Sequence, residues 1–207
     1  MYVPPAFKSD DATAWAFVAA RGFGTVIVMG NGLPAAVHVP LLATEDGDVR
    51  RLEFHVARAN PIGGLLTTDA PVLVIVSGPD SYVSPDWYVT PNQVPTWNYV
   101  SVHVAGTAKT MPRTKARAHI DMLSARFENR LAPKRPWTAE KMPAGHVEKM
   151  LAAITPIELR VERLDAQWKL NQNKSRSDRA SVMRMLASSG HWSSLAVADL
   201  MHEQLND

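Results

Sequence analysis

Polar and hydrophobic positions alternate with a period of two in the middle of the chain, which predicts a β-strand from Trp97 to Gly106. One face of this strand carries an amide and three valines: Asn98, Val100, Val102 and Val104. The other face carries two aromatic rings, a hydroxyl and an imidazole: Trp97, Tyr99, Ser101 and His103. The valine face is typical of a core. The opposite face suits a flat ligand with polar edges, or another subunit.

Further apolar segments predict strands on both sides of this one. They cover residues 23–29, 33–43, 51–57, 71–76, 81–83 and 157–164, the last extended by 167–170. We expect Ser81–Val83 to pair with the strand before it. The turn signals Gly30-Asn31-Gly32 and Glu45–Asp48 separate neighbouring strands, because Asn and Gly accept a positive φ at low cost. Several strands joined by tight turns predict a closed or nearly closed barrel, since closure removes exposed edges.

Helical spacing appears at both ends of the chain and after the central strand. The first predicted helix has Ser9 or Asp10 as its cap and runs to Arg21, with Gly22 as the terminating residue. Asn60-Pro61 is expected to open a short helix that reaches Thr67. Four more helices are predicted, over residues 113–129, 147–154, 178–187 and 192–205.

Composition narrows the class of protein. The chain has 207 residues, of which 46% are hydrophobic and 20% charged, as is usual for a globular domain. It has no apolar run of membrane-spanning length and no N-terminal export signal, so we expect a cytoplasmic protein without membrane segments. The absence of cysteine excludes disulfides and thiolate chemistry. A net charge of only +2 gives no argument for nucleic-acid binding.

Two strand ends carry candidate binding chemistry. His38 interrupts an apolar strand and Pro40 removes a ladder donor, so a bulge there can expose backbone groups to a ligand. The alternative is a core histidine with a hydrogen-bonded ring. Arg58 and Asn60 lie on the turn after the strand 51–57, where a guanidinium and backbone N–H groups suit a phosphate. The alternative here is a solvated arginine beside an ordinary helix cap.

Two other segments are open to two interpretations. The stretch 168–176 ends a strand with cations and amides, which either close over an anionic ligand or form a solvated connection. The loop 78–88 carries three aromatic rings, which either stack on a ring system or subunit, or lie against the barrel. Neither an HxH nor an HExxH spacing is present, so no metal site is predicted. The GxSxG, Walker A and GxGxxG motifs are also absent.

Taken together, these segments resemble one family. The matching elements are HVPLL (38–42), HVARANP (55–61), GPxSYxSPxWY (78–88), VPTWNYxSVHVxG (94–106) and WKLxQNK (168–174). They are similar to those of the PaiB-type FMN-binding negative transcriptional regulators, in order, over residues 1–174. The resemblance implies a mainly β fold, a split β-barrel of the pyridoxamine-phosphate-oxidase-like type with peripheral and C-terminal helices. It also implies a homodimer with FMN bound between the subunits.

The resemblance further implies which residues bind FMN. The isoalloxazine would be lined by backbone groups of His38, Val39, Pro40 and Leu41. The ribityl phosphate would be held by His55, Val56, Arg58 and Asn60. The facing side, from the other subunit, would contribute Trp97, Asn98 and Tyr99. A tryptophan and arginine pair of the broader oxidase group corresponds to Trp168 and Lys169. An arginine and a lysine of that group are replaced here by His38 and Ala43, so phosphate binding rests on fewer cations.

The resemblance implies a flavin-dependent or flavin-sensing negative regulator of transcription. The alternatives are a small FMN-dependent oxidoreductase, of the flavin-reductase or pyridoxamine-phosphate-oxidase type, and a haem-binding protein that uses His191 or His202. Residues 1–174 are expected to form the flavin-binding barrel, and residues 175–207 a helical extension packed on the barrel or the dimer. A helix-turn-helix in that extension is disfavoured, because residues 178–207 carry two arginines against four acidic residues.

Overall fold

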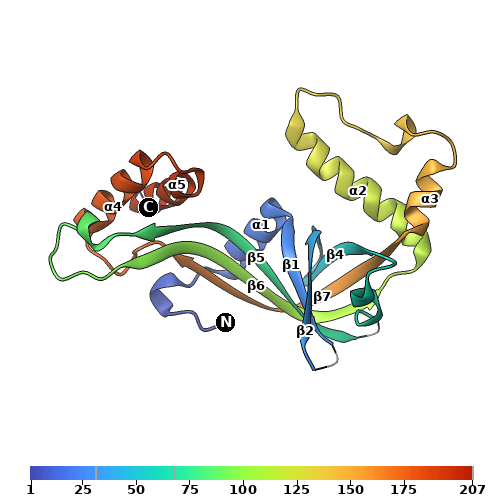
Figure 1. Ribbon diagram of the computed structural model, residues 1–207, viewed down its shortest axis with the longest axis horizontal. Coiled ribbons are helices and arrows are strands. Elements are labelled where there is room, and N and C mark those ends of the chain that lie inside the picture. Colours follow the sequence, from blue (N-terminus) through green and yellow to red (C-terminus); the bar gives the residue numbers. More distant parts are fainter. Residues whose placement is uncertain (31, 68, 207) are drawn as a thin grey trace. The chain divides into compact units, whose positions relative to one another are not determined.

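The computed structural model describes residues 1–30, 32–67 and 69–206, without the side chain of residue 206. Its strands are β1 (Phe23–Met29), β2 (Pro34–Pro40), β3 (Leu42–Asp46), β4 (Val49–Ala57), β5 (Ala70–Val83), β6 (Thr96–Thr110) and β7 (Ile154–Lys169). Its α-helices are α1 (Asp11–Arg21), α2 (Ala116–Glu128), α3 (His146–Ala152), α4 (Arg176–Ser188) and α5 (Trp192–Asn206) (Figure 1). Short 3-10 helices include η2 (Pro61–Gly64), η3 (Pro85–Trp87) and η6 (Ala139–Lys141).

The strands form one sheet in the order β2-β1-β5-β6-β7-β4-β3. Its two edge strands, β2 and β3, are consecutive in the chain and are separated only by Leu41. The sheet therefore curls until its edges meet at this residue, whose N–H donates to the carbonyl of Gly22 at 2.9 Å. Gly22 follows α1 with a φ of +58°, as its predicted terminating role requires. Curling the sheet in this way leaves fewer exposed backbone groups at its edges.

The chain divides into two compact units. The barrel unit comprises residues 15–76 and 103–164, and the helical unit comprises residues 1–14, 77–102 and 165–207. In the barrel unit the core is made of inward side chains of alternating strand positions, among them Val26, Leu52, Phe54 and Leu159. The helical unit has a second apolar cluster, which includes Val83 and Leu170. Helices α4 and α5 (red in Figure 1) contribute Val182, Leu186, Val197 and Met201 to this cluster. The predicted boundary between residues 174 and 175 stays a prediction.

The central strand has the predicted pattern. Burial along β6 alternates without a break from Asn98 to Ala108, with Asn98 and the valines inside. The first helix is also confirmed, because Asp10 caps it by accepting the backbone N–H of Thr13 at 2.9 Å. Asn60 caps η2 in the same way, by accepting the N–H of Ile62 at 3.1 Å. The helix that follows is shorter than predicted, since it ends at Gly64 and has 3-10 geometry. Asn31, the centre of one predicted turn, lies outside the described residues.

Two strand predictions are wrong. Residues 33–43 do not form one strand, because the chain turns a barrel corner at Leu41 between β2 and β3. Ser81–Val83 does not pair with the strand before it, because residues 70–83 are a single strand, β5. Gly78 and Pro79 lie inside this continuous strand. β1 pairs with β5 over Val72–Ile75, so Pro79 lies beyond that pairing and removes no donor from it.

Candidate functional site

The first predicted ligand segment lies at the end of β2. His38 is exposed, and its Nδ1 is 2.8 Å from the Thr25 hydroxyl of the neighbouring strand. It is therefore a surface residue and not the core histidine that was the alternative. Val39 and Leu41 have buried side chains, and the N–H of Leu41 is already bonded within the barrel. What this segment can offer a ligand is the His38 ring and the backbone of residues 39–40.

The second predicted ligand segment lies at the end of β4. Val56 is buried in the barrel core, whereas Arg58 is exposed. The backbone of Arg58 is fixed by a 2.8 Å hydrogen bond from its N–H to the Ala153 carbonyl. Its guanidinium donates through Nη2 to the Ile154 carbonyl at 3.3 Å. A guanidinium has five N–H donors, so this cation retains the capacity to bind an anion from outside.

His55 belongs to a chain of three polar side chains that the sequence did not reveal. Its Nδ1 is 3.1 Å from Nε2 of His119 on α2, and Nδ1 of His119 is 3.2 Å from a carboxylate oxygen of Glu53. The two imidazoles meet edge to face, with centroids 5.3 Å apart. His119 is almost wholly buried. Burial lowers the pKa of His55, and the neighbouring His119 lowers it further.

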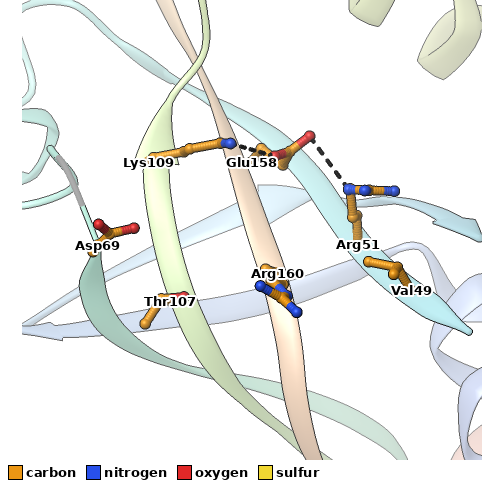
Figure 2. Close-up of a pocket in the computed structure, with 7 residues that line it drawn as sticks. All are labelled: Val49, Arg51, Asp69, Thr107, Lys109, Glu158 and Arg160. Atoms are coloured by element: carbon orange, nitrogen blue, oxygen red, sulfur yellow. Dashed lines mark ion pairs between the residues drawn. The ribbon is translucent and has the colours of Figure 1, made fainter.

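A cationic pocket of about 420 Å³ lies on the outer face of β4, β7 and β6 (Figure 2). Lys109 and Arg51 both pair with Glu158, at 3.3 and 3.8 Å. Arg160 points into the same pocket and, among the described residues, makes no ion pair. These cations are far apart in sequence. The available signal was period-two placement within each strand, which puts Arg51 on one face of β4 and Glu158 with Arg160 on one face of β7.

The register joins this pocket to the histidines. Arg51 lies opposite Arg160, Glu53 opposite Glu158, and His55 opposite Pro156. Alternate residues share a face, so these pairs line one stripe of the outer barrel surface. Within the barrel unit the structure thus places charged groups at one end of a stripe and an imidazole at the other.

The remaining predicted residues lie in the helical unit. Trp97 is 53% exposed and meets Tyr82 edge to face, with centroids 6.1 Å apart. Tyr99 is half-buried on the same strand face. Asn98, in contrast, is buried, and its Nδ2 lies 3.5 Å from the sulfur of Met201. Its side chain therefore belongs to the packing of α5, and only its backbone can reach a ligand.

Trp168 and Lys169 end β7 in the helical unit. Trp168 packs against the apolar cluster under α4 and α5. The ammonium of Lys169 donates to the Thr96 hydroxyl at 2.7 Å, which links the ends of β7 and β6. Burial lowers the pKa of this lysine. The pair is therefore held beside the start of the aromatic strand face.

The match to known families covers most of the chain. A family model described as "Putative FMN-binding domain" matches residues 1–163. The protease synthase and sporulation protein PAI 2 of Bacillus subtilis is 31% identical over 206 residues, which are 99% of this chain and 98% of that protein. The chain belongs to this FMN-binding family. The resemblance to the PaiB-type proteins is therefore confirmed, and FMN is the cofactor that membership assigns.

Solved structures agree with the fold of this FMN-binding chain. The FAD and heme binding protein from Mycobacterium smegmatis aligns with a TM-score of 0.57 and 20% identity, covering 88% of this chain and 79% of that one. The flavocytochrome Anf3 from Azotobacter vinelandii aligns with a TM-score of 0.52 and 22% identity, covering 77% and 67%. At such identities the likeness concerns the fold alone, and it confirms the split-barrel class with peripheral helices.

The FMN-binding residues implied by the resemblance fall into two groups. The barrel unit holds the residues from His38 to Leu41 and from His55 to Asn60, and the helical unit holds Trp97–Tyr99 with Trp168 and Lys169. Among the described residues, no three His, Asp or Glu side chains are arranged to hold a metal ion. No described helix is both long and apolar enough to span a membrane.

Proposed function

We propose that this protein is a homodimeric FMN-binding regulator of the PaiB type, with FMN held between two copies of the chain. The observation that carries the proposal is the family match over a barrel whose β4 end presents an exposed arginine, Arg58. One copy would supply the barrel residues around Arg58, and its partner the aromatic face at Trp97. The boundary at residues 174 and 175 and the cytoplasmic location are parts of the same proposal.

The residues of the barrel unit are suited to the phosphate end of FMN. A phosphate dianion requires charged donors, and a guanidinium can bind it through two parallel hydrogen bonds. Arg58 is anchored through its backbone, which fixes the base of its side chain while the guanidinium stays exposed. Asn60 uses its side-chain oxygen in the cap of η2, so only its amide nitrogen remains to donate. Phosphate binding is therefore proposed to depend mainly on Arg58.

The exposed aromatic pair supports the dimer. Tyr82 is 45% exposed, and its ring meets Trp97 on the neighbouring strand. Large exposed aromatic groups of this kind mark interfaces or ring-binding surfaces. If the subunit interface also holds the isoalloxazine, these aromatic rings would serve both as interface residues and as a surface for ring binding. When bound, FMN supplies an electron-accepting ring, while the protein provides its position and electrostatic surroundings.

We propose that regulation does not depend on reading DNA through α4 and α5. The apolar residues of both helices are used in the core of the helical unit. Arg179 on α4 donates to the carbonyl of Gln204 at 3.3 Å, which directs it toward α5. Phosphate-binding surfaces of DNA readers are strongly positive, and this helix pair is not. Regulation is proposed to act through the flavin-bearing dimer.

A flavin titration tests the cofactor assignment. FMN and riboflavin differ by the phosphate, so wild-type protein should bind FMN at least about tenfold more tightly, as measured by quenching of flavin fluorescence. In Arg58→Ala that preference should disappear, while riboflavin binding stays unchanged. Arg160→Ala is the matched control, because it removes an equal charge from the cationic pocket. A loss of preference in Arg160→Ala but not in Arg58→Ala would contradict the assignment of the phosphate to Arg58.

A small flavin-dependent oxidoreductase is the second candidate. It is favoured by the His55, His119 and Glu53 chain, which can relay a proton near the proposed phosphate residues. Steady oxidation of NADH or NADPH by the FMN-loaded protein, with electrons passed to an added acceptor, would establish this activity. Its absence, together with flavin-dependent repression of a reporter gene, would support the regulator.

A further inference from the structure

An apolar pocket of about 290 Å³ lies in the barrel unit beside His55. Its walls come from α2, from residues 137–142 and from α3, and include Ile120, Trp137, Met142 and Met150. Of the described residues that line it, none is Lys, Arg, Asp or Glu, and His55 supplies the strongest polar group. Apart from His55, the lining includes no residue that the FMN resemblance assigns.

The histidine chain beside this pocket leaves one ring nitrogen of His55 available. Nδ1 of His55 is engaged by His119, which leaves Nε2 for a ligand. His119 is 1% exposed, and its second nitrogen is 3.2 Å from the carboxylate of Glu53. The ring of His55 is therefore held by a side chain that is itself held, so its orientation is set before a ligand arrives.

The proton positions along this chain follow from the chemistry of its end. A carboxylate only accepts hydrogen bonds, so Nδ1 of His119 must donate to Glu53. When Nε2 of His119 accepts, Nδ1 of His55 is the donor and Nε2 of His55 carries the free lone pair. The lowered pKa of His55, caused first by burial, keeps this imidazole neutral. In this arrangement Nε2 is the acceptor nitrogen of a ring that lines an apolar pocket.

We propose that this pocket is a second ligand site, at which His55 serves in place of its implied role at the FMN phosphate, and that it binds a small, mainly apolar aromatic alcohol through a hydroxyl that donates to Nε2 of His55. The walls bury the hydrocarbon part, and the imidazole accepts the single donor. Anions are disfavoured, because none of the described lining residues is a cation and the available nitrogen of His55 carries a lone pair. This inference goes beyond the proposed function and does not depend on FMN being bound.

Calorimetric titration with 4-propylphenol and with its methyl ether, 4-propylanisole, tests the site in the full-length protein. The two probes differ in the hydroxyl proton, so wild-type protein should bind the phenol about tenfold more tightly. His55→Phe should remove this preference while the ether still binds. Ala139→Trp should abolish binding of both probes by filling the pocket. His191→Phe, a change at an exposed histidine of the helical unit, should leave the tenfold preference intact.

Two results would overturn the proposal. The first is equal affinity of the two probes for wild-type protein. The second is loss of phenol binding when FMN is present at saturation, because the pocket would then be part of the flavin site. A measurement on wild-type protein covers the case in which the variants do not fold. The ¹⁵N resonance of His55 Nε2 should shift on addition of the phenol and stay unchanged with the ether. Flavin affinity is measured separately, so a failed FMN assignment would not be mistaken for a failed phenol site.

Discussion

Asp178 shows how one side chain can hold a loop and a helix together. It lies in the first turn of α4, where its N–H donates to the Ser175 hydroxyl at 3.1 Å and its carboxylate accepts that hydroxyl in return at 2.9 Å. The other carboxylate oxygen accepts the N–H groups of Val89 and Thr90 at 2.8 and 2.9 Å. These bonds, with the backbone N–H of Thr90 as the largest cause, lower the pKa of Asp178 to about 2.

Asp178→Asn should lower the melting temperature at pH 7 by several degrees, because the amide cannot accept the same set of bonds. The sign of the pH dependence follows from the lowered pKa. Between about pH 4 and pH 2, the native carboxylate stays ionised, whereas the carboxylate of the unfolded chain, with a pKa near 3.9, already binds a proton. Its stabilisation is complete above about pH 4 and is lost as the pH falls toward 2.

Melting curves of wild-type protein and Asp178→Asn, recorded from pH 7 to pH 2, would test this prediction. The difference between the two melting temperatures should shrink as the pH falls and vanish near pH 2. Asp121→Asn serves as the control, because Asp121 forms an exposed pair with Arg117 one helical turn away. Such pairs contribute little, so this change should have a small effect throughout. A difference for Asp178→Asn that is independent of pH would count against the ionised network.

At the scale of secondary-structure elements, the close approach of β6 and β7 depends on one glycine. A Cβ built on Gly106 would lie 1.9 Å from the carbonyl oxygen of Arg160. This obstacle is backbone and not a flexible side chain, so it cannot move without separating the strands. The glycine that ends the central sequence motif is thus required by strand packing. Gly106 lies on the inward face of β6, but the obstructing carbonyl belongs to Arg160, whose side chain lines the cationic pocket and would move with its strand.

Gly106→Ala should destabilise the protein by at least about 2 kcal/mol, because overpacking here forces the backbone to shift. Urea denaturation of the variant and of wild-type protein would measure this change. Gly64→Ala is the matched control: its added Cβ would meet nothing within 4 Å, so the change should stay within about 0.5 kcal/mol. Equal stabilities of the two variants would show that the strands can separate freely at Gly106.

At the scale of the whole molecule, the prediction concerns assembly. If two copies meet at the aromatic face of β5 and β6, Trp97→Asp places a charge in the seam. The dimer dissociation constant should then rise by about 30-fold or more, and FMN should bind more weakly. Light scattering after size-exclusion chromatography would show a fall from about twice 22.7 kDa toward the mass of one chain.

Trp192→Asp provides the control for this prediction. Trp192 is 73% exposed at the start of α5, so the same substitution changes an equally apolar surface residue away from the strand face. Dimer mass and FMN affinity should be unchanged in this variant. A monomeric wild-type protein that still binds FMN tightly would contradict a flavin site shared between subunits.

The sequence alone determined most of the elements and the family. Period-two burial along β6, the caps at Asp10 and Asn60 and the turn at Gly22 are local effects, encoded within a few residues of where they act. The motifs identified the FMN-binding family through their sequence and their order along the chain. Local propensity misjudged features that depend on a neighbour, such as the continuity of β5 through Pro79 and the corner at Leu41, and it overestimated the length of the helix after Asn60.

The tertiary structure decided which distant residues share a site. His119 lies 64 positions from His55 in sequence and 66 from Glu53, yet the three form one hydrogen-bonded chain. Spacing places Glu53 and His55 on one strand face, but no pattern in the sequence links them to His119, because α2 reaches β4 only through packing in three dimensions. The cationic pocket is similar, since strand order and register bring Arg51 and Arg160 together. Spacing along the chain sets which face a residue occupies, whereas its neighbours on that face depend on how the sheet closes.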